Sequence, residues 1–156
     1  MSEQIAVLPE NAGSNVARPA GKKPLKRLAI VIRDDAYDRL YTPLTFAYTA
    51  AKQGVEVDIL FVLWAVRVLT ETGAKAVAID PLHAHEDAWF RSRLERDGDP
   101  LSIRDFIALL KETGKVRFYG CRFAAATFDV DESNLVSEAE GMIDALEDSS
   151  EGDWMN

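Results

Sequence analysis

The sequence predicts a single-domain α/β fold, with a mostly parallel sheet and helices on both faces in a doubly wound arrangement. Two apolar runs, at residues 28–32 and 55–63, are typical of strands, and the first is continuously apolar, as in strands covered on both faces. A helical pattern with short links separates them, and a strand–helix–strand unit requires parallel strands. The chain has 156 residues, of which 47% are apolar, which suits one domain with a core.

The first helix is expected between these strands. Thr42 and Pro43 indicate its start, because a hydroxyl residue caps a helix and proline suits the first helical position. Gly54 indicates its end. After the second strand, residues 64–71 predict another helix, closed by Gly73.

Residues 74–100 are not assigned as a whole, although a polar helix is expected over residues 86–96. Ser102 and Asp105 resemble a capping box, with aspartate in place of the usual glutamate, and they open a helix that stops at Gly114.

The remaining elements are a short apolar strand at residues 116–121 and a final helix, expected because apolar residues recur at helical spacing over residues 135–146. The domain is therefore placed at residues 25–147. Residues 1–24 are expected to be a flexible tail rich in small and polar residues, and residues 148–156 an acidic tail.

The net charge of −8 is unevenly distributed. No lysine or arginine follows Arg122, whereas residues 129–153 carry ten acidic side chains. Such a block repels nucleic acid and is either a solvated surface or a docking surface for a basic protein. No apolar run approaches the ~20 residues of a membrane span, and no secretion pattern is found, so we expect neither membrane nor nucleic-acid partners.

Cys121 is the only cysteine, which excludes disulfides within the chain and multi-cysteine metal sites, and fits a cytoplasmic location. It ends an apolar strand, with Gly120 before it and Arg122 after it, and positive charge favours the reactive thiolate. The carboxyl ends of parallel strands are where ligands collect, and residues 33–35 and 63–64 should converge there with Cys121. The alternative is a small buried hydrophobic side chain.

The other motifs are weaker indications of function. No glycine-rich phosphate-binding loop follows the first strand. His83 and His85 lack partner ligands for a metal, so a surface loop is expected. Asp34 and Asp35 are either an acid–base pair or caps of a turn.

Two segments carry a family resemblance. Residues 58–65, Asp-Ile-Leu-Phe-Val-Leu-Trp-Ala, resemble the strand ending in Phe-Trp-Gly of DsrE/DsrF-like sulfur-trafficking proteins. Residues 115–121, Lys-Val-Arg-Phe-Tyr-Gly-Cys, resemble that family's strand ending in Tyr-Ala-Cys, and the whole match spans roughly residues 26–147. Ala65 and Gly120 depart from the usual glycine and alanine.

The resemblance implies a small α/β domain that assembles as trimers or hexamers and a cysteine that carries persulfide sulfur between partner proteins. Cys121 would be the carrier and Trp64 a neighbouring pocket residue. Family members commonly end in a strand after the final helix, whereas here the chain runs into the acidic residues 147–153, so the sequence leaves open whether that strand is present or replaced.

The sequence therefore predicts a sulfurtransferase or sulfur carrier without a metal or organic cofactor. Arg33 and Arg122 are candidates to stabilise the thiolate and persulfide anions, and Gly120 would let a partner's backbone approach. Expected partners are TusA-like sulfur carriers and enzymes of sulfur oxidation or thiolation. The alternatives are a non-catalytic scaffold that docks through an acidic helix after Asp129, with Cys121 structural, or a thiol peroxidase or reductase that relies on an external thiol.

Overall fold

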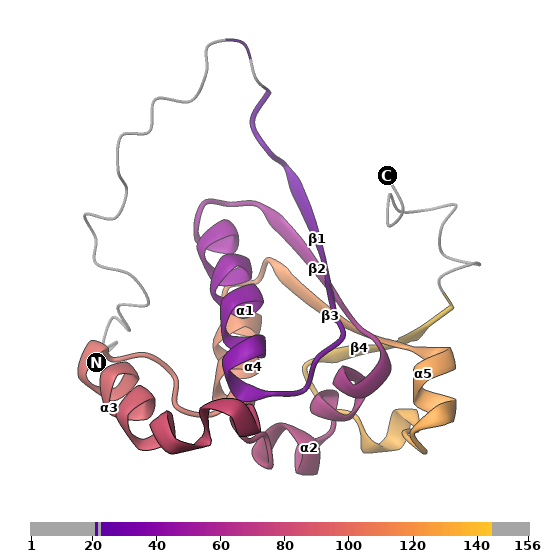
Figure 1. Ribbon diagram of the computed structural model, residues 1–156. Helices are drawn as coiled ribbons and strands as arrows, with labels where there is room; N and C mark the ends of the chain where they lie inside the picture. The colour runs from indigo at the N-terminus through magenta and orange to yellow at the C-terminus, as the bar shows by residue number, and fades with distance from the viewer. Residues whose placement is uncertain (1–20, 22, 145–156) are drawn as a thin grey trace.

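The computed structural model of the chain describes residues 21 and 23–144 (Figure 1). Within them, four strands form one sheet in the order β1-β2-β3-β4, and all neighbouring strands are parallel. Their bounds are β1 Arg27–Ile32, β2 Glu56–Phe61, β3 Val116–Cys121 and β4 Ala139–Ile143. The predicted single-domain parallel α/β sheet is confirmed. The tails expected at residues 1–24 and 148–156 lie almost wholly outside the described residues.

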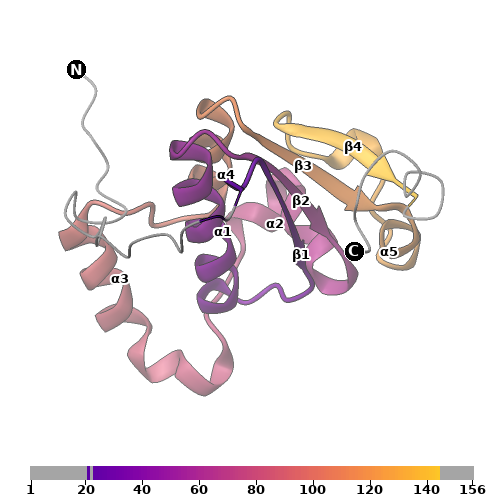
Figure 2. The same cartoon turned by 90° about the horizontal axis from the view of Figure 1, so that it is seen from above.

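Helices α1 (Tyr37–Lys52) and α4 (Ile103–Glu112) pack side by side on one face of the sheet (Figures 1 and 2). Both helices bury residues at helical spacing, and every second residue of β2 and β3 points into the same core. The core includes Leu40, Leu44, Ile59, Phe106 and Phe118. Helices α1 and α4 therefore cover one face of the sheet, and neither of them covers the other face.

That second face carries Val31, Asp58, Leu60 and Tyr119, which alternate with the core residues along the strands. Val31 is exposed, whereas Asp58 is only 2% exposed. Two arginines of the neighbouring strands neutralise the Asp58 carboxylate: Arg27 Nε lies 2.7 Å from it and Arg117 Nε lies 2.5 Å from it. A buried carboxylate is tolerated in a sheet only when it is paired in this way.

Helix α1 begins earlier than the sequence indicated. It starts at Tyr37, so Pro43 lies inside it and Thr42 is not its cap. Burial of Tyr37 and Leu40, together with a bond from Tyr37 N to Ala78 O, extends the helix towards the N-terminus despite the proline. The end was predicted well, because the helix stops at Lys52 and Gly54 follows with φ +83°.

The single helix expected at residues 64–71 is two elements, the 3₁₀ helix η2 (Leu63–Leu69) and the short helix α2 (Glu71–Lys75). Thr70 separates them, because its backbone is extended and its side chain accepts a hydrogen bond from Gly73 N at 2.9 Å. Gly73 therefore lies inside α2 and does not close the preceding helix.

Residues 74–100 contain the 3₁₀ helix η3 (Pro81–Glu86) and helix α3 (Asp87–Asp97). The polar helix expected over residues 86–96 is thereby confirmed. Of its residues only Leu94 is fully buried, and α3 stands away from the sheet in both views (Figures 1 and 2).

The final helix expected over residues 135–146 is wrong. Cys121 is followed by the short helix α5 (Arg122–Thr127) and then by the 3₁₀ helix η4 (Glu132–Asn134). Of the apolar residues at helical spacing, Ala139, Met142 and Ile143 belong to strand β4, whereas residues 145–146 lie outside the described part of the chain. Met142 lies beside Gly120 and is buried by that pairing, which outweighs the helical spacing. The last strand that the family resemblance implies is present, and no acidic docking helix forms within residues 129–144.

Among the described residues, no helix combines the length and the apolar character needed to cross a membrane.

Candidate functional site

Cys121 is the last residue of β3, which lies between β2 and β4 in the sheet. It pairs with Ile143 of β4, and helix α5 begins at the next residue. Its side chain lies on the same face of β3 as those of Arg117 and Tyr119, the face that α1 and α4 do not cover, and it is partly exposed. Cys121 also borders a small apolar cluster that comprises Val66, Ala124, Ala125 and Met142. The thiol therefore has a fixed backbone and a side open to solvent.

Gly120 is buried and faces Met142. A Cβ at this position would lie 2.5 Å from Met142 Sδ and 3.5 Å from Val66 Cγ2. The missing side chain makes room for Met142, so the expected approach of a partner's backbone at Gly120 is wrong: the space is already filled from within the domain.

The two arginines expected near the thiol differ in position. Arg122, the residue after Cys121, donates from Nη2 to the carbonyl oxygen of Met142 at 3.1 Å, which ties the start of α5 to β4. Arg33 is exposed and follows β1, which is separated from β3 by β2. Strands lie about 4.8 Å apart, so Arg33 starts roughly 10 Å from the strand of Cys121. The structure brings Arg122 to the site and leaves Arg33 at its margin.

Trp64 belongs to a stack of three side chains at the carboxyl end of the sheet. Its ring centroid lies 4.8 Å from that of Phe128, and Arg67 Cζ lies 5.2 Å from each ring. Arg67 also donates from Nη2 to Asp35 at 3.3 Å. Trp64 remains 53% exposed. Phe128 borders the same apolar cluster as Cys121, so the stack and the thiol flank one structural unit.

Sequence reasoning missed Arg67 and Phe128. Arg67 lies three residues after Trp64, and in a predicted helix this spacing places both on one face, which is a usable signal. The sequence contains no comparable signal for Phe128, because only the turn after α5 brings this residue close to η2.

The backbone that carries the stack is tightly held. Leu63, the first residue of η2, has φ +49°, an uncommon and costly conformation for a residue other than glycine. The carbonyl of Arg67 accepts a hydrogen bond from Thr70 Oγ1 at 2.8 Å. Gly73 approaches the same carbonyl so closely that a Cβ there would lie 1.8 Å from the oxygen. The position of Arg67 is therefore fixed by its own turn.

Beside the stack lies a cleft of about 450 Å³. Asp35, Arg67, Val68, Val77, Ile79 and Pro81 are among the residues that line it. Cys121 is not among them, so this cleft is separate from the thiol.

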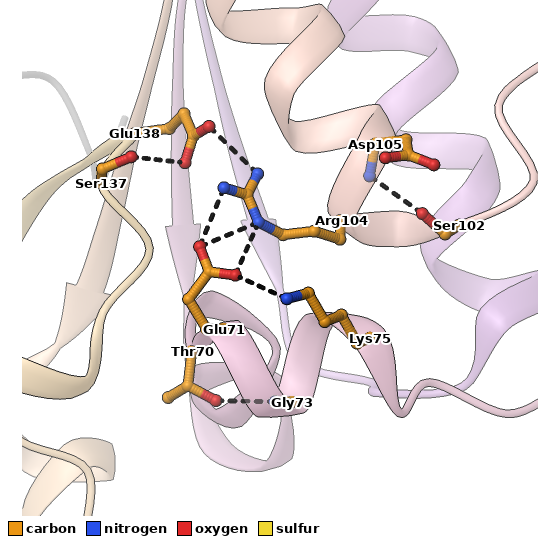
Figure 3. A network of polar contacts seen from close by, with 9 residues as sticks. All are labelled: Thr70, Glu71, Gly73, Lys75, Ser102, Arg104, Asp105, Ser137 and Glu138. Carbon is orange, nitrogen blue, oxygen red and sulfur yellow. Dashed lines mark hydrogen bonds and ion pairs between the residues drawn. The ribbon is translucent and has the colours of Figure 1, made fainter.

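A network of charged side chains holds the segment that leads into β4 (Figure 3). Arg104 of α4 donates to Glu71 of α2 at 3.0 Å and to Glu138 at 3.0 Å, and Glu138 directly precedes β4. The Arg104 guanidinium holds the pKa of Glu71 below its usual value. Because β4 flanks Cys121, this network supports the strand next to the thiol.

The remaining candidate motifs lie at the surface near side chains of opposite charge. His83 and His85 are exposed on η3 and lie 3.8 Å and 3.9 Å from the carboxylate of Glu86. Asp34 and Asp35 lie near Arg39 and Arg67 at 3.7 Å and 3.3 Å. No cluster of three or more metal-ligating side chains occurs within residues 23–144.

Comparisons with known proteins agree with this fold. The structure is similar to that of the YchN protein from E. coli, with a TM-score of 0.54, 14% identity, and 81% of this chain and 91% of that chain covered. It is also similar to MTH1491 from Methanobacterium thermoautotrophicum, described as a protein of unknown function, with a TM-score of 0.48, 12% identity, and 81% and 94% covered. No curated protein matches the sequence. The model of the DsrE/DsrF-like family matches residues 26–153. Because this match covers more than half of the chain, the chain belongs to the DsrE/DsrF-like family.

Proposed function

We propose that this protein is a sulfur carrier that holds sulfane sulfur as a persulfide on Cys121. Family membership supports a role in sulfur relay in general. The observation that carries the finer proposal is the position of the only thiol: partly exposed, at the end of an inner strand, on the face that α1 and α4 leave uncovered.

The proposed transfer is a thiol exchange. The Cys121 thiolate attacks the outer sulfur of a donor persulfide, a new S–S bond forms, and the donor's S–S bond breaks. The donor cysteine leaves as a thiolate, so no external oxidant or reductant is consumed. In the second half, an acceptor thiolate attacks the outer sulfur on Cys121 and releases the Cys121 thiolate. Arg122, whose guanidinium donates to Met142 O on the neighbouring strand, is the first candidate to pair with the persulfide anion, and the more distant Arg33 is the second.

The direct test is mass spectrometry after incubation with polysulfide. The protein should gain the mass of one or more sulfur atoms, and a reducing thiol should remove it. Cys121→Ser is the key variant, and because the side chain is partly exposed it should fold normally. Gain of sulfur by Cys121→Ser, or none by the native protein, would contradict the proposal.

The proposed partners are TusA-like carriers and enzymes of sulfur oxidation or thiolation. Mixing sulfur-loaded protein with a reduced TusA-like protein should move the mass increment to the acceptor. A homo-oligomer, trimer or hexamer, is also proposed, and sedimentation equilibrium would measure the subunit number.

A further inference from the structure

The stack of Trp64, Arg67 and Phe128 has the composition of a protein-binding hot spot. Tryptophan and arginine dominate such sites, where an aromatic anchor sits beside a charge of fixed position. The two rings and the guanidinium lie within 5.2 Å of one another. Phe123, on the helix that joins Cys121 to Phe128, is 80% exposed. This much exposed aromatic surface around a cation is typical of an interface.

The cation in this stack can bind a second carboxylate. Arg67 uses Nη2 for Asp35, and a guanidinium carries five N–H donors. The two rings hold the planar group in place, and the turn through Thr70 and Gly73 fixes its backbone. Little side-chain freedom is therefore lost when a partner's carboxylate binds, which favours recognition.

The distance between the stack and Cys121 limits which partner segments can contact both. From Cys121 to Phe128 the chain runs through helix α5, six residues long. At 1.5 Å per residue the two Cα atoms are about 10 Å apart. An extended segment covers about the same distance in three residues. A partner cysteine at Cys121 would thus place a residue three positions away over the stack.

We propose that Trp64, Arg67 and Phe128 form the docking site for an apolar, carboxylate-bearing segment of the protein that exchanges sulfur with Cys121. The apolar side chain of the segment packs on Trp64 and Phe128, and its carboxylate pairs with Arg67. This proposal rests on the proposed function of Cys121 and adds the chemistry by which its partner is chosen.

The test uses three short peptides whose cysteine is activated as a mixed disulfide with pyridine-2-thiol. Their sequences are Cys-Leu-Ala-Glu, Cys-Leu-Ala-Gln and Cys-Ala-Ala-Glu, each amidated at the C-terminus, so that the first and third residues after the cysteine point to the same side of an extended segment. Attack by Cys121 forms a protein–peptide disulfide, breaks the activated one and releases pyridine-2-thione, whose absorbance reports the rate. The Cys-Leu-Ala-Glu peptide should react about two- to fivefold faster than the Cys-Leu-Ala-Gln peptide, the range of a partly exposed ion pair. It should also react faster than the Cys-Ala-Ala-Glu peptide.

Arg67→Gln should abolish the preference for glutamate over glutamine, measured as the ratio of the two peptide rates, in which any change in the reactivity of the thiol itself cancels. Trp64→Ala should abolish the preference for leucine over alanine. The matched control is Arg93→Gln, because Arg93 stacks on Trp89 with the same 5.2 Å spacing on α3, far from α5 (Figure 1).

Equal rates for the three peptides with the native protein would overturn the docking site, as would an effect of Arg93→Gln equal to that of Arg67→Gln. Failure of the proposed function is separate: it would be seen as absence of sulfur on Cys121 after polysulfide treatment, whatever the peptides do.

Discussion

Replacing Gly73 by alanine gives opposite predictions from helix propensity and from the structure. Gly73 lies inside the helix α2, where alanine is normally favoured over glycine by about 1 kcal/mol. Here the added Cβ would lie 1.8 Å from Arg67 O and 2.7 Å from Thr70 Oγ1. The first contact involves a backbone atom, so the turn itself must open by more than about 1 Å. Overpacking of this kind costs about 1–3 kcal/mol.

The displacement also threatens the cap of α2, since Thr70 accepts from Gly73 N, and a lost cap costs about 0.5–2 kcal/mol. After the propensity gain is subtracted, the free energy of unfolding should fall by about 0.5–4 kcal/mol, with a central value of about 2 kcal/mol, measured by urea unfolding followed by circular dichroism. The comparison variant is Gly114→Ala, where φ is +69° but no atom lies within 4 Å of the new Cβ. That variant should lose only about 1 kcal/mol. A Gly73→Ala protein as stable as native, or more stable than Gly114→Ala, would refute the steric reasoning.

Two further predictions concern buried carboxylates. Asp58→Asn should lower the free energy of unfolding by about 3 kcal/mol in urea titrations, because two arginines lose their buried partner. Glu56→Gln, which removes an exposed ion pair with Lys115, should lower it far less. A loss for Asp58→Asn no larger than that for Glu56→Gln would contradict this. Burial, assisted by the nearby charge of Asp97, raises the pKa of Asp99 to about 6. The folded state then binds this proton more tightly than the unfolded state, so stability should fall as pH rises from about 4 to about 6. Asp99→Asn should flatten this decline and be more stable than native at pH 7; an unchanged pH profile would argue against it.

Strands β1 and β2 and the capped helix α4 could be predicted from the sequence because their signals are local and strong. Residues 28–32 and 55–63 are apolar runs, and Ser102 does accept the bond from Asp105 N, at 3.0 Å. Such patterns predict the structure correctly because the apolar residues that form the pattern are also the residues that the core buries.

Where the sequence misled, a tertiary contact outweighed a local pattern. The spacing over residues 135–146 fits a helix, but Met142 fills the space beside Gly120 and draws this stretch into the sheet. Pro43 marks a plausible start, but burial of Tyr37 begins the helix earlier. In both cases the deciding partner is distant in sequence.

The candidate site also contains residues that the sequence predicts and residues that it does not. The position of Cys121 at a strand end follows from the apolar run before it, and its neighbour Arg122 is placed by the chain itself. Arg67 and Phe128 meet only because η2 and α5 pack against each other. No single segment carries that information.

The attachment of Cys121 to an inner strand has a consequence for how cargo would travel. An S–S bond is about 2.05 Å long, so a bound sulfur atom projects barely beyond its anchor. Carriers with long, flexible prosthetic groups move their cargo from one active site to another. A sulfur atom bound to a cysteine in a sheet stays at the position where it was accepted. Donor and acceptor must therefore each come to this protein in turn, and delivery would be governed by how often they meet it and how briefly they stay.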